Sequence, residues 1–82
     1  MKSYAVVFTY SWDRDAAVYT FDTESEAAEF LEGAYEAEFQ SDRESGYGSD
    51  GFMNEDRHFA RIIKPSPMDN DVTDFYLARV YE

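Results

Sequence analysis

The chain has 82 residues, and its 18 Asp and Glu against seven Lys and Arg give a formal net charge of −11. This length allows one domain, residues 1–82, and a hydrophobic content of 44% with 18% aromatic residues argues against disorder. The lack of cysteine excludes disulfides, thiolate metal sites and a cysteine nucleophile, and the negative charge disfavours direct binding to nucleic acid or to anionic membranes.

The start of the chain carries no targeting pattern. Met1–Tyr4 lacks an apolar signal region, and the longest uninterrupted apolar run, Ala5–Phe8, is far shorter than the ~20 residues that span a bilayer. We therefore expect a soluble protein of the cytoplasm.

The first elements are predicted to form a β-hairpin. Ser3–Tyr10 alternates in the manner of a strand, with an apolar or aromatic side chain at every even position. Ser11–Asp15 is a polar connection of about five residues, a length typical of hairpins. Ala16–Phe21 is predicted as a second, shorter strand, so we expect the two strands to pair antiparallel.

A helix is predicted after this hairpin. Thr23 and Glu26 have the S/T-x-x-E spacing of a capping box, and the residues that follow, to about Gln40, are mostly good helix formers. At 100° per residue the apolar side chains form one stripe, made of Ala27, Phe30, Leu31, Ala34 and Tyr35. Glu38 falls near the centre of this stripe, which predicts that the last turn frays or leaves the body of the domain.

The rest of the chain is predicted as a long loop followed by two strands. Ser41–Asp56 contains Gly, Ser, Asp and Asn without a sustained period, and we expect it to form a loop of about sixteen residues. Arg57–Lys64 alternates as a third strand, and the proline-containing segment Lys64–Asp71 is typical of turns. A fourth strand is predicted from Val72 or Thr73 to Tyr81.

These elements predict an α+β two-layer domain of order ββαββ. It consists of a four-stranded, mainly antiparallel sheet with one helix on one face. We place the first and fourth strands at the centre because they are the longest and most apolar, and the short second and basic third strands at the edges. The expected spatial order is therefore 2-1-4-3.

One helix covers only one face of such a sheet, and aromatic side chains remain on the other face in either register. Two interpretations stay open: the face is a dimer or partner surface, or the loop that carries Tyr47, Phe52 and Met53 folds over it as a lid. Stacking of single-stranded RNA on these aromatics is disfavoured, because such platforms need cationic surroundings.

The most specific feature of the sequence is a row of acids along the predicted helix. The acidic ridge, opposite the apolar stripe, consists of Glu26, Glu29, Glu32 and Glu36. No Lys or Arg lies between Arg14 and Arg43, so the ridge has no basic neighbour along the chain. The candidate partner-binding set adds the acids that follow, Asp42, Glu44, Asp50, Glu55 and Asp56. A merely solvated helix face and adaptation to high salt are the alternative interpretations.

The acids predict a small protein-binding module. It is expected to inhibit a nucleic-acid-handling protein by docking on its basic surface and imitating nucleic-acid charge. In composition the chain resembles small phage-borne or mobile-element inhibitors such as some anti-CRISPR proteins, although no motif carries the likeness. The alternative is a homodimeric or accessory interaction domain that acts through the aromatic sheet face, with the acids serving solubility.

No pattern in the chain indicates an enzyme, a cofactor or a metal site. His58 is the only histidine, and nucleophile-elbow and phosphate-loop motifs are absent. Asp69–Asp74 begins like an EF-hand loop, but its sixth position is Asp74 instead of Gly and its twelfth is Val80 instead of Glu. We therefore expect no catalytic residue, no cofactor and no specific metal site.

Overall fold

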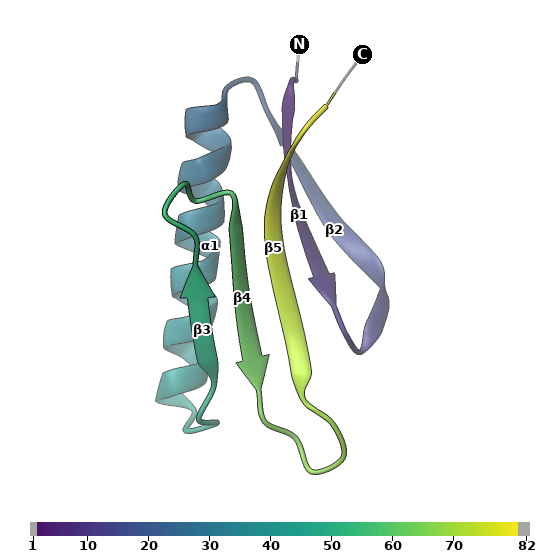
Figure 1. The fold of residues 1–82 in the computed structure, drawn as a ribbon, viewed down its shortest axis with the longest axis vertical. Helices are drawn as coiled ribbons and strands as arrows, with labels where there is room; N and C mark the ends of the chain where they lie inside the picture. The colour runs from purple at the N-terminus through teal and green to yellow at the C-terminus, as the bar shows by residue number, and fades with distance from the viewer. Residues whose placement is uncertain (1, 81–82) are drawn as a thin grey trace.

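The computed structural model describes residues 2–80, which form one helix packed on a five-stranded antiparallel sheet (Figure 1). The elements are β1 (Tyr4–Tyr10), β2 (Asp13–Phe21), α1 (Glu24–Glu44), β3 (Asp50–Met53), β4 (Phe59–Lys64) and β5 (Asp71–Arg79). Across the sheet the strands lie in the order β2-β1-β5-β4-β3. The predicted class, α+β with one helix and an antiparallel sheet, is confirmed.

The predicted element order lacks one strand, because β3 lies inside the segment expected to be a loop, residues 41–56. α1 takes the first residues of that segment, and β3 pairs with β4, with Phe52 opposite Arg61. A strand of four residues that includes Gly51 is too short to show alternation in the sequence. The four expected strands do lie in the predicted order, and β3 extends the sheet rather than covering it as a lid.

Two strands begin at other residues than predicted. β2 begins at Asp13 rather than Ala16, so a tight turn replaces the five-residue connection, and the β1–β2 register shifts between Phe8 and Tyr10. The expected third strand begins at Phe59, because Arg57 has a φ of 60° and belongs to the turn between β3 and β4. Tyr81, the predicted end of the last strand, lies outside the described residues.

The helix begins where the capping box predicts. The Thr23 Oγ1 accepts a hydrogen bond from the Glu26 backbone N–H at 3.2 Å, and its hydroxyl donates to Glu26 Oε1 at 3.0 Å. α1 continues to Glu44, four residues beyond the expected end. Glu38 is exposed, but Asp42, one turn further on, is buried against Ser49, so the last turn is held to the domain and does not fray.

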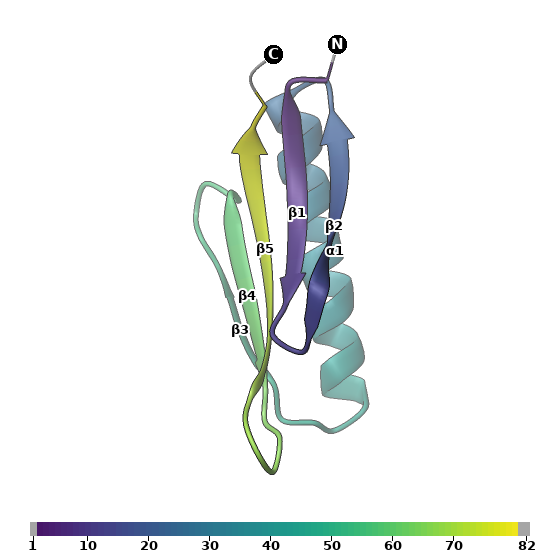
Figure 2. The same cartoon turned by 90° about the vertical axis from the view of Figure 1, so that its right-hand side faces the viewer.

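The core lies between α1 and one face of the sheet. Leu31 of α1 and Val6 and Ile62 of the sheet are fully buried. Phe8, Phe75 and Tyr35 surround them, and the rings of Phe8 and Phe75 meet edge to face with centroids 4.8 Å apart. Figure 2 shows α1 behind the strands and no other element on their near side, so the sheet has one covered and one uncovered face.

β3 packs against α1 through a close approach of its backbone. A Cβ atom added at Gly51 would lie 2.7 Å from Tyr35 Oη and 3.2 Å from Tyr35 Cε1. Glycine is therefore needed at this position, because any side chain would meet the buried tyrosine ring.

Candidate interaction surfaces

The acidic ridge lies on the solvent side of α1. The side chains of Glu26, Glu29 and Glu36 are exposed and that of Glu32 is half-buried. With a rise of ~1.5 Å per helical residue, Glu32 lies ~4.5 Å from Glu29 and ~6 Å from Glu36 along the axis. These spacings place like charges at i+3 and i+4, where they repel one another.

No Lys or Arg of residues 2–80 forms an ion pair with the ridge. The ion pairs of other acids are Lys2 with Asp22, Arg61 with Asp74 and Lys64 with Asp42, together with contacts of His58 to two further carboxylates. Of the four ridge residues, Glu26 alone has a side-chain hydrogen bond, the one that it accepts from Thr23. The ridge therefore presents its charge to solvent.

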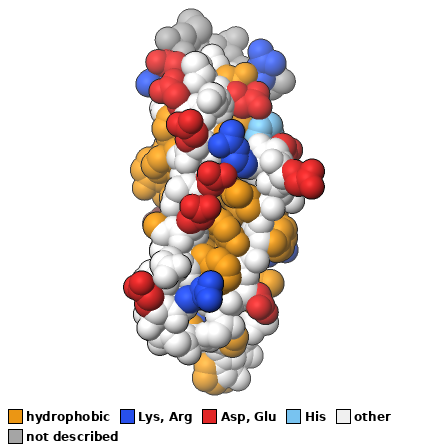
Figure 3. All heavy atoms as spheres, turned by 90° about the vertical axis from the view of Figure 1, so that its left-hand side faces the viewer, with side chains coloured by type: hydrophobic (Ala, Val, Ile, Leu, Met, Phe, Trp, Pro, Cys, Tyr) orange, Lys and Arg blue, Asp and Glu red, His pale blue; other side chains and the backbone are white. Residues whose placement is uncertain are grey.

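Four of the remaining predicted acids are exposed, and they lie in two separate parts of the molecule. Glu44 ends α1 and Asp50 begins β3 at one end of the molecule, whereas Glu55 and Asp56 lie in the turn between β3 and β4. Figure 3, which shows the side where α1 and β3 lie, has Asp and Glu side chains along both borders of a hydrophobic strip. Glu44, Glu55 and Asp56 therefore extend the negative surface beyond the ridge, whereas alternation along β3 places Asp50 on the uncovered face of the sheet.

Asp42 is placed differently from the other predicted acids. The residue is only 6% exposed, and its side chain accepts a hydrogen bond from Ser49 Oγ at 3.0 Å. Lys64 Nζ lies 3.8 Å from the same carboxylate. Asp42 therefore joins the end of α1 to the start of β3 and to β4, and its carboxylate is buried rather than presented to solvent.

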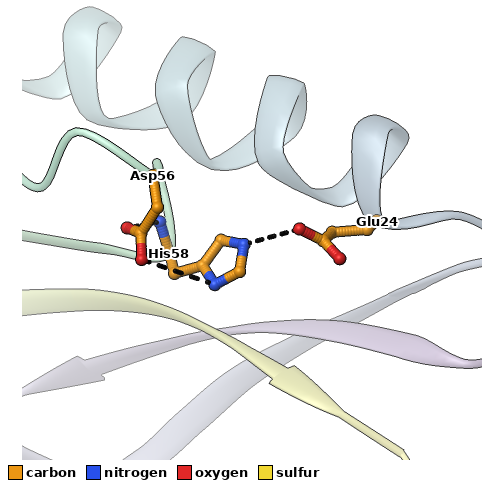
Figure 4. A network of polar contacts seen from close by, with 3 residues as sticks. All are labelled: Glu24, Asp56 and His58. Carbon is orange, nitrogen blue, oxygen red and sulfur yellow. Dashed lines mark hydrogen bonds and ion pairs between the residues drawn. The ribbon is translucent and has the colours of Figure 1, made fainter.

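His58 joins the start of α1 to the β3–β4 turn (Figure 4). Its Nε2 lies 2.9 Å from Glu24 Oε1, and its Nδ1 lies 3.8 Å from Asp56 Oδ2. The Asp56 side chain also accepts a hydrogen bond from the His58 backbone N–H at 3.0 Å. These contacts give the only histidine a structural role, which spacing in the sequence does not reveal because Glu24 is 34 residues away.

The uncovered face of the sheet forms a second candidate surface, which we name the open face. By alternation along the paired strands, it consists of Ala5, Val7, Thr9, Val18, Thr20, Asp50, Phe52, Phe59, Arg61, Ile63, Val72, Asp74, Tyr76 and Ala78. Val18, Val7, Tyr76 and Phe59 lie side by side across four strands. Such a row on an uncovered face is a hydrophobic patch of the kind that marks interaction sites.

An ion pair lies at the centre of the open face. Arg61 Nε donates to Asp74 Oδ1 at 2.6 Å and Arg61 Nη2 donates to Asp74 Oδ2 at 3.2 Å, so the pair is bidentate. The hydrogen bond and the charge of Asp74 raise the pKa of the Arg61 guanidinium. Arg61 also lies over the Phe59 ring at 5.5 Å, and the Phe59 and Phe52 centroids are 5.9 Å apart. The sequence alone did not reveal this cluster, because it depends on the register between β4 and β5.

Within residues 2–80 the structure has no pocket, and no group of three or more His, Asp or Glu side chains is arranged to hold a metal ion. No helix in that range has the length and apolar character needed to cross a membrane.

Comparisons with protein-family models, with curated proteins and with solved structures gave no match.

Proposed function

We propose that this chain is a small acidic protein-binding module that docks on the basic, nucleic-acid-binding surface of another protein and thereby blocks it. The acidic ridge carries the proposal: four carboxylates lie on one side of a 21-residue helix, and none is paired with a Lys or Arg of the described residues. The exposed acids Glu44, Glu55 and Asp56 add to the same interface, whereas Asp50 lies on the open face, on the other side of the sheet.

The energetics of the ridge favour a basic partner. Repulsion between carboxylates at i+3 and i+4 destabilises the free helix by a few tenths of a kcal/mol per pair. Lys and Arg side chains from a partner would relieve that repulsion on docking. The net charge of −11 also speeds encounter with a positive surface by long-range attraction.

The spacing of charges along the ridge can be compared with the spacing of phosphates in DNA. Four carboxylates over a rise of ~15 Å give one charge per ~5 Å. A single DNA strand carries one phosphate per ~3.4 Å, and the duplex carries one per ~1.7 Å of axis. The ridge alone therefore corresponds to part of one strand, and the acids beside β3 are needed for a larger footprint.

The test is capture of partners from a lysate of the host cells on immobilised protein, washed between ~50 and ~500 mM salt. The decisive variant changes Glu26, Glu29, Glu32 and Glu36 to Gln. Its matched control changes Asp13, Asp15, Asp69 and Asp71 to Asn, which alters the net charge by the same amount away from the ridge.

The proposal expects a nucleic-acid-binding protein that is captured by the wild type and by the control, and lost in the Gln variant and at high salt. It is contradicted if the Gln variant keeps the partner, or if the control loses it equally. Equal loss would show that total charge, rather than the ridge, determines binding.

A specific observation favours a second candidate function, an accessory interaction domain that acts through the open face. This face carries a continuous hydrophobic row in a chain whose charged residues are 30% of the total. A partner bound there would tolerate salt, because burial of apolar surface is not screened. Tyr76→Lys would abolish such binding, whereas the Gln substitutions on the ridge would not.

A further inference from the structure

We propose that the open face binds a second copy of this chain, so that the protein is a homodimer with its two sheets face to face. This inference deepens the second candidate function and rests on the open face being an interaction surface. It is independent of the acidic ridge, which lies on the other side of the sheet.

The open face carries few charged residues. Among the paired residues of the open face only Asp50, Arg61 and Asp74 are charged, and the same alternation along β2 adds Arg14, in a chain that has 18 acids and seven Lys and Arg. Two molecules of net charge −11 repel each other in most orientations. They approach at the least cost through the face that holds the fewest acids, with both helices turned outward.

The two charges at the centre of the open face are paired with each other. Arg61 and Asp74 neutralise each other through two hydrogen bonds within one molecule. Covering the pair therefore leaves neither charge without a partner, which is the condition under which buried charges are tolerated. A partner recognised by its charge would find only Asp50 and Arg14, near the borders of the face on its two outer strands, whereas an apolar, self-complementary partner fits the rest of the face.

The position of the hydrophobic residues fits a two-fold contact. β5 is the central strand, so Tyr76 and the Arg61–Asp74 pair lie near the middle of the face, with Val18 and Phe52 on the two outer strands. A two-fold axis through the middle brings the row of one copy against the row of the other. Isologous contacts of this kind close on themselves and give dimers rather than chains.

The size of the face is close to that of the smallest specific interfaces. Five strands ~4.8 Å apart, which are four to nine residues long, cover about 20 by 22 Å at ~3.3 Å per residue, roughly 450 Å² in projection. Accessible area exceeds projected area because side chains protrude. The pair of faces therefore approaches the ~1,000 Å² that separates specific interfaces from chance contacts.

The test is sedimentation equilibrium of the purified full chain over a wide range of concentrations, at low and at high salt. Phe52→Lys and Tyr76→Lys change exposed side chains of the open face on two different strands. Trp12→Lys and Met68→Lys are matched controls, because they change exposed hydrophobic side chains in turns outside the face and alter the net charge equally. Circular dichroism of each variant checks that it folds.

We expect the wild type and both controls to sediment at twice the 9.5 kDa chain mass, and the dimer to persist or strengthen at high salt, where repulsion between the acidic copies is screened. Both face variants should sediment as folded monomers.

The inference is overturned if the wild type is a monomer at every concentration and salt. It is also overturned if folded Phe52→Lys and Tyr76→Lys variants remain dimers, which would place the contact elsewhere, for example at the β2 edge. A monomeric wild type whose captured partner is lost in Tyr76→Lys would retain the second candidate function with a different protein as partner. A monomeric wild type that still captures a partner through the acidic ridge would overturn this inference but not the first proposed function.

Discussion

At the residue scale, Gly51 and Tyr35 determine how β3 joins the domain. The ring of Tyr35 is buried, and its hydroxyl would be the nearest atom to a Cβ at position 51, at 2.7 Å. Gly51→Ala therefore forces the ring or the strand to move. We expect a loss of ~1–3 kcal/mol in the free energy of unfolding, the range of overpacking substitutions, measured by urea denaturation.

The variant Tyr35→Phe is a control for this contact. Tyr35→Phe removes the hydroxyl but keeps the ring, so the double variant should regain part of the stability that Gly51→Ala loses. If Gly51→Ala has the same effect in the wild type and in the Tyr35→Phe variant, the tyrosine hydroxyl is not the source of the strain.

Asp42 differs from the other predicted partner-binding acids because it is buried. The residue falls in a segment without periodicity, and only the continuation of α1 to Glu44 turns its side chain toward Ser49 and Lys64. Asp42→Ala leaves both partners without their acceptor, and we expect the free energy of unfolding to fall by ~1–3 kcal/mol. Asp42→Asn keeps an acceptor for Ser49 and should cost less; a larger loss from Asp42→Asn than from Asp42→Ala would contradict this role.

Two tyrosines link stability to alkaline pH. Burial raises the pKa of both Tyr10 and Tyr35 above the ordinary value of 10.0, with smaller contributions from nearby Tyr19, Glu38 and Asp13 at Tyr10 and from Glu36 at Tyr35. The unfolded chain therefore loses these protons at a lower pH than the folded chain does. Stability is retained below the ordinary pKa and falls as the pH rises through it toward the raised values.

Thermal unfolding at pH values from about 8 to above about 10 tests this linkage. The double variant Tyr10→Phe, Tyr35→Phe should lose less stability over that interval than the wild type. Tyr47→Phe, a change at an exposed ring, is the control. An identical pH dependence in the double variant and the wild type would contradict the account.

At the element scale, α1 was largely predictable and β3 was not. The capping box, the apolar stripe and the acidic ridge depend on residues three and four apart, so the sequence reveals them directly. β3 depends on pairing with β4 and on the Gly51–Tyr35 approach, which are long-range contacts. The Arg61–Asp74 pair likewise needs the β4–β5 register, and the end of the helix needs the distant partners of Asp42.

The ridge itself makes a prediction about the stability of α1. Changing Glu29, Glu32 and Glu36 to Gln removes repulsion at i+3 and i+4 spacings, so the free protein should gain a few tenths of a kcal/mol per pair at low salt. Differential scanning calorimetry should show a higher Tm, and the gain should shrink as salt screens the charges. A lower Tm at low salt would show that these acids stabilise the fold through contacts other than those described.

At the scale of the whole molecule, the protein has two unlike surfaces on opposite sides. One carries the acidic ridge on α1, and the other is the largely uncharged open face of the sheet. A dimer through the open face would place the two ridges on its outer sides, with both sheets, ~10 Å apart, between them. Such a dimer would offer two separate acidic sites, so that each copy could occupy one basic partner.

Competition with DNA tests the central claim, that the ridge occupies a nucleic-acid-binding surface, most directly. The captured partner is bound to a fluorescently labelled duplex, and the anisotropy is followed as the acidic protein is added. We predict that the wild type and the Asn control displace the duplex, and that the variant with Glu26, Glu29, Glu32 and Glu36 changed to Gln needs at least about tenfold more protein. A partner that holds the duplex and the acidic protein at the same time would contradict the claim.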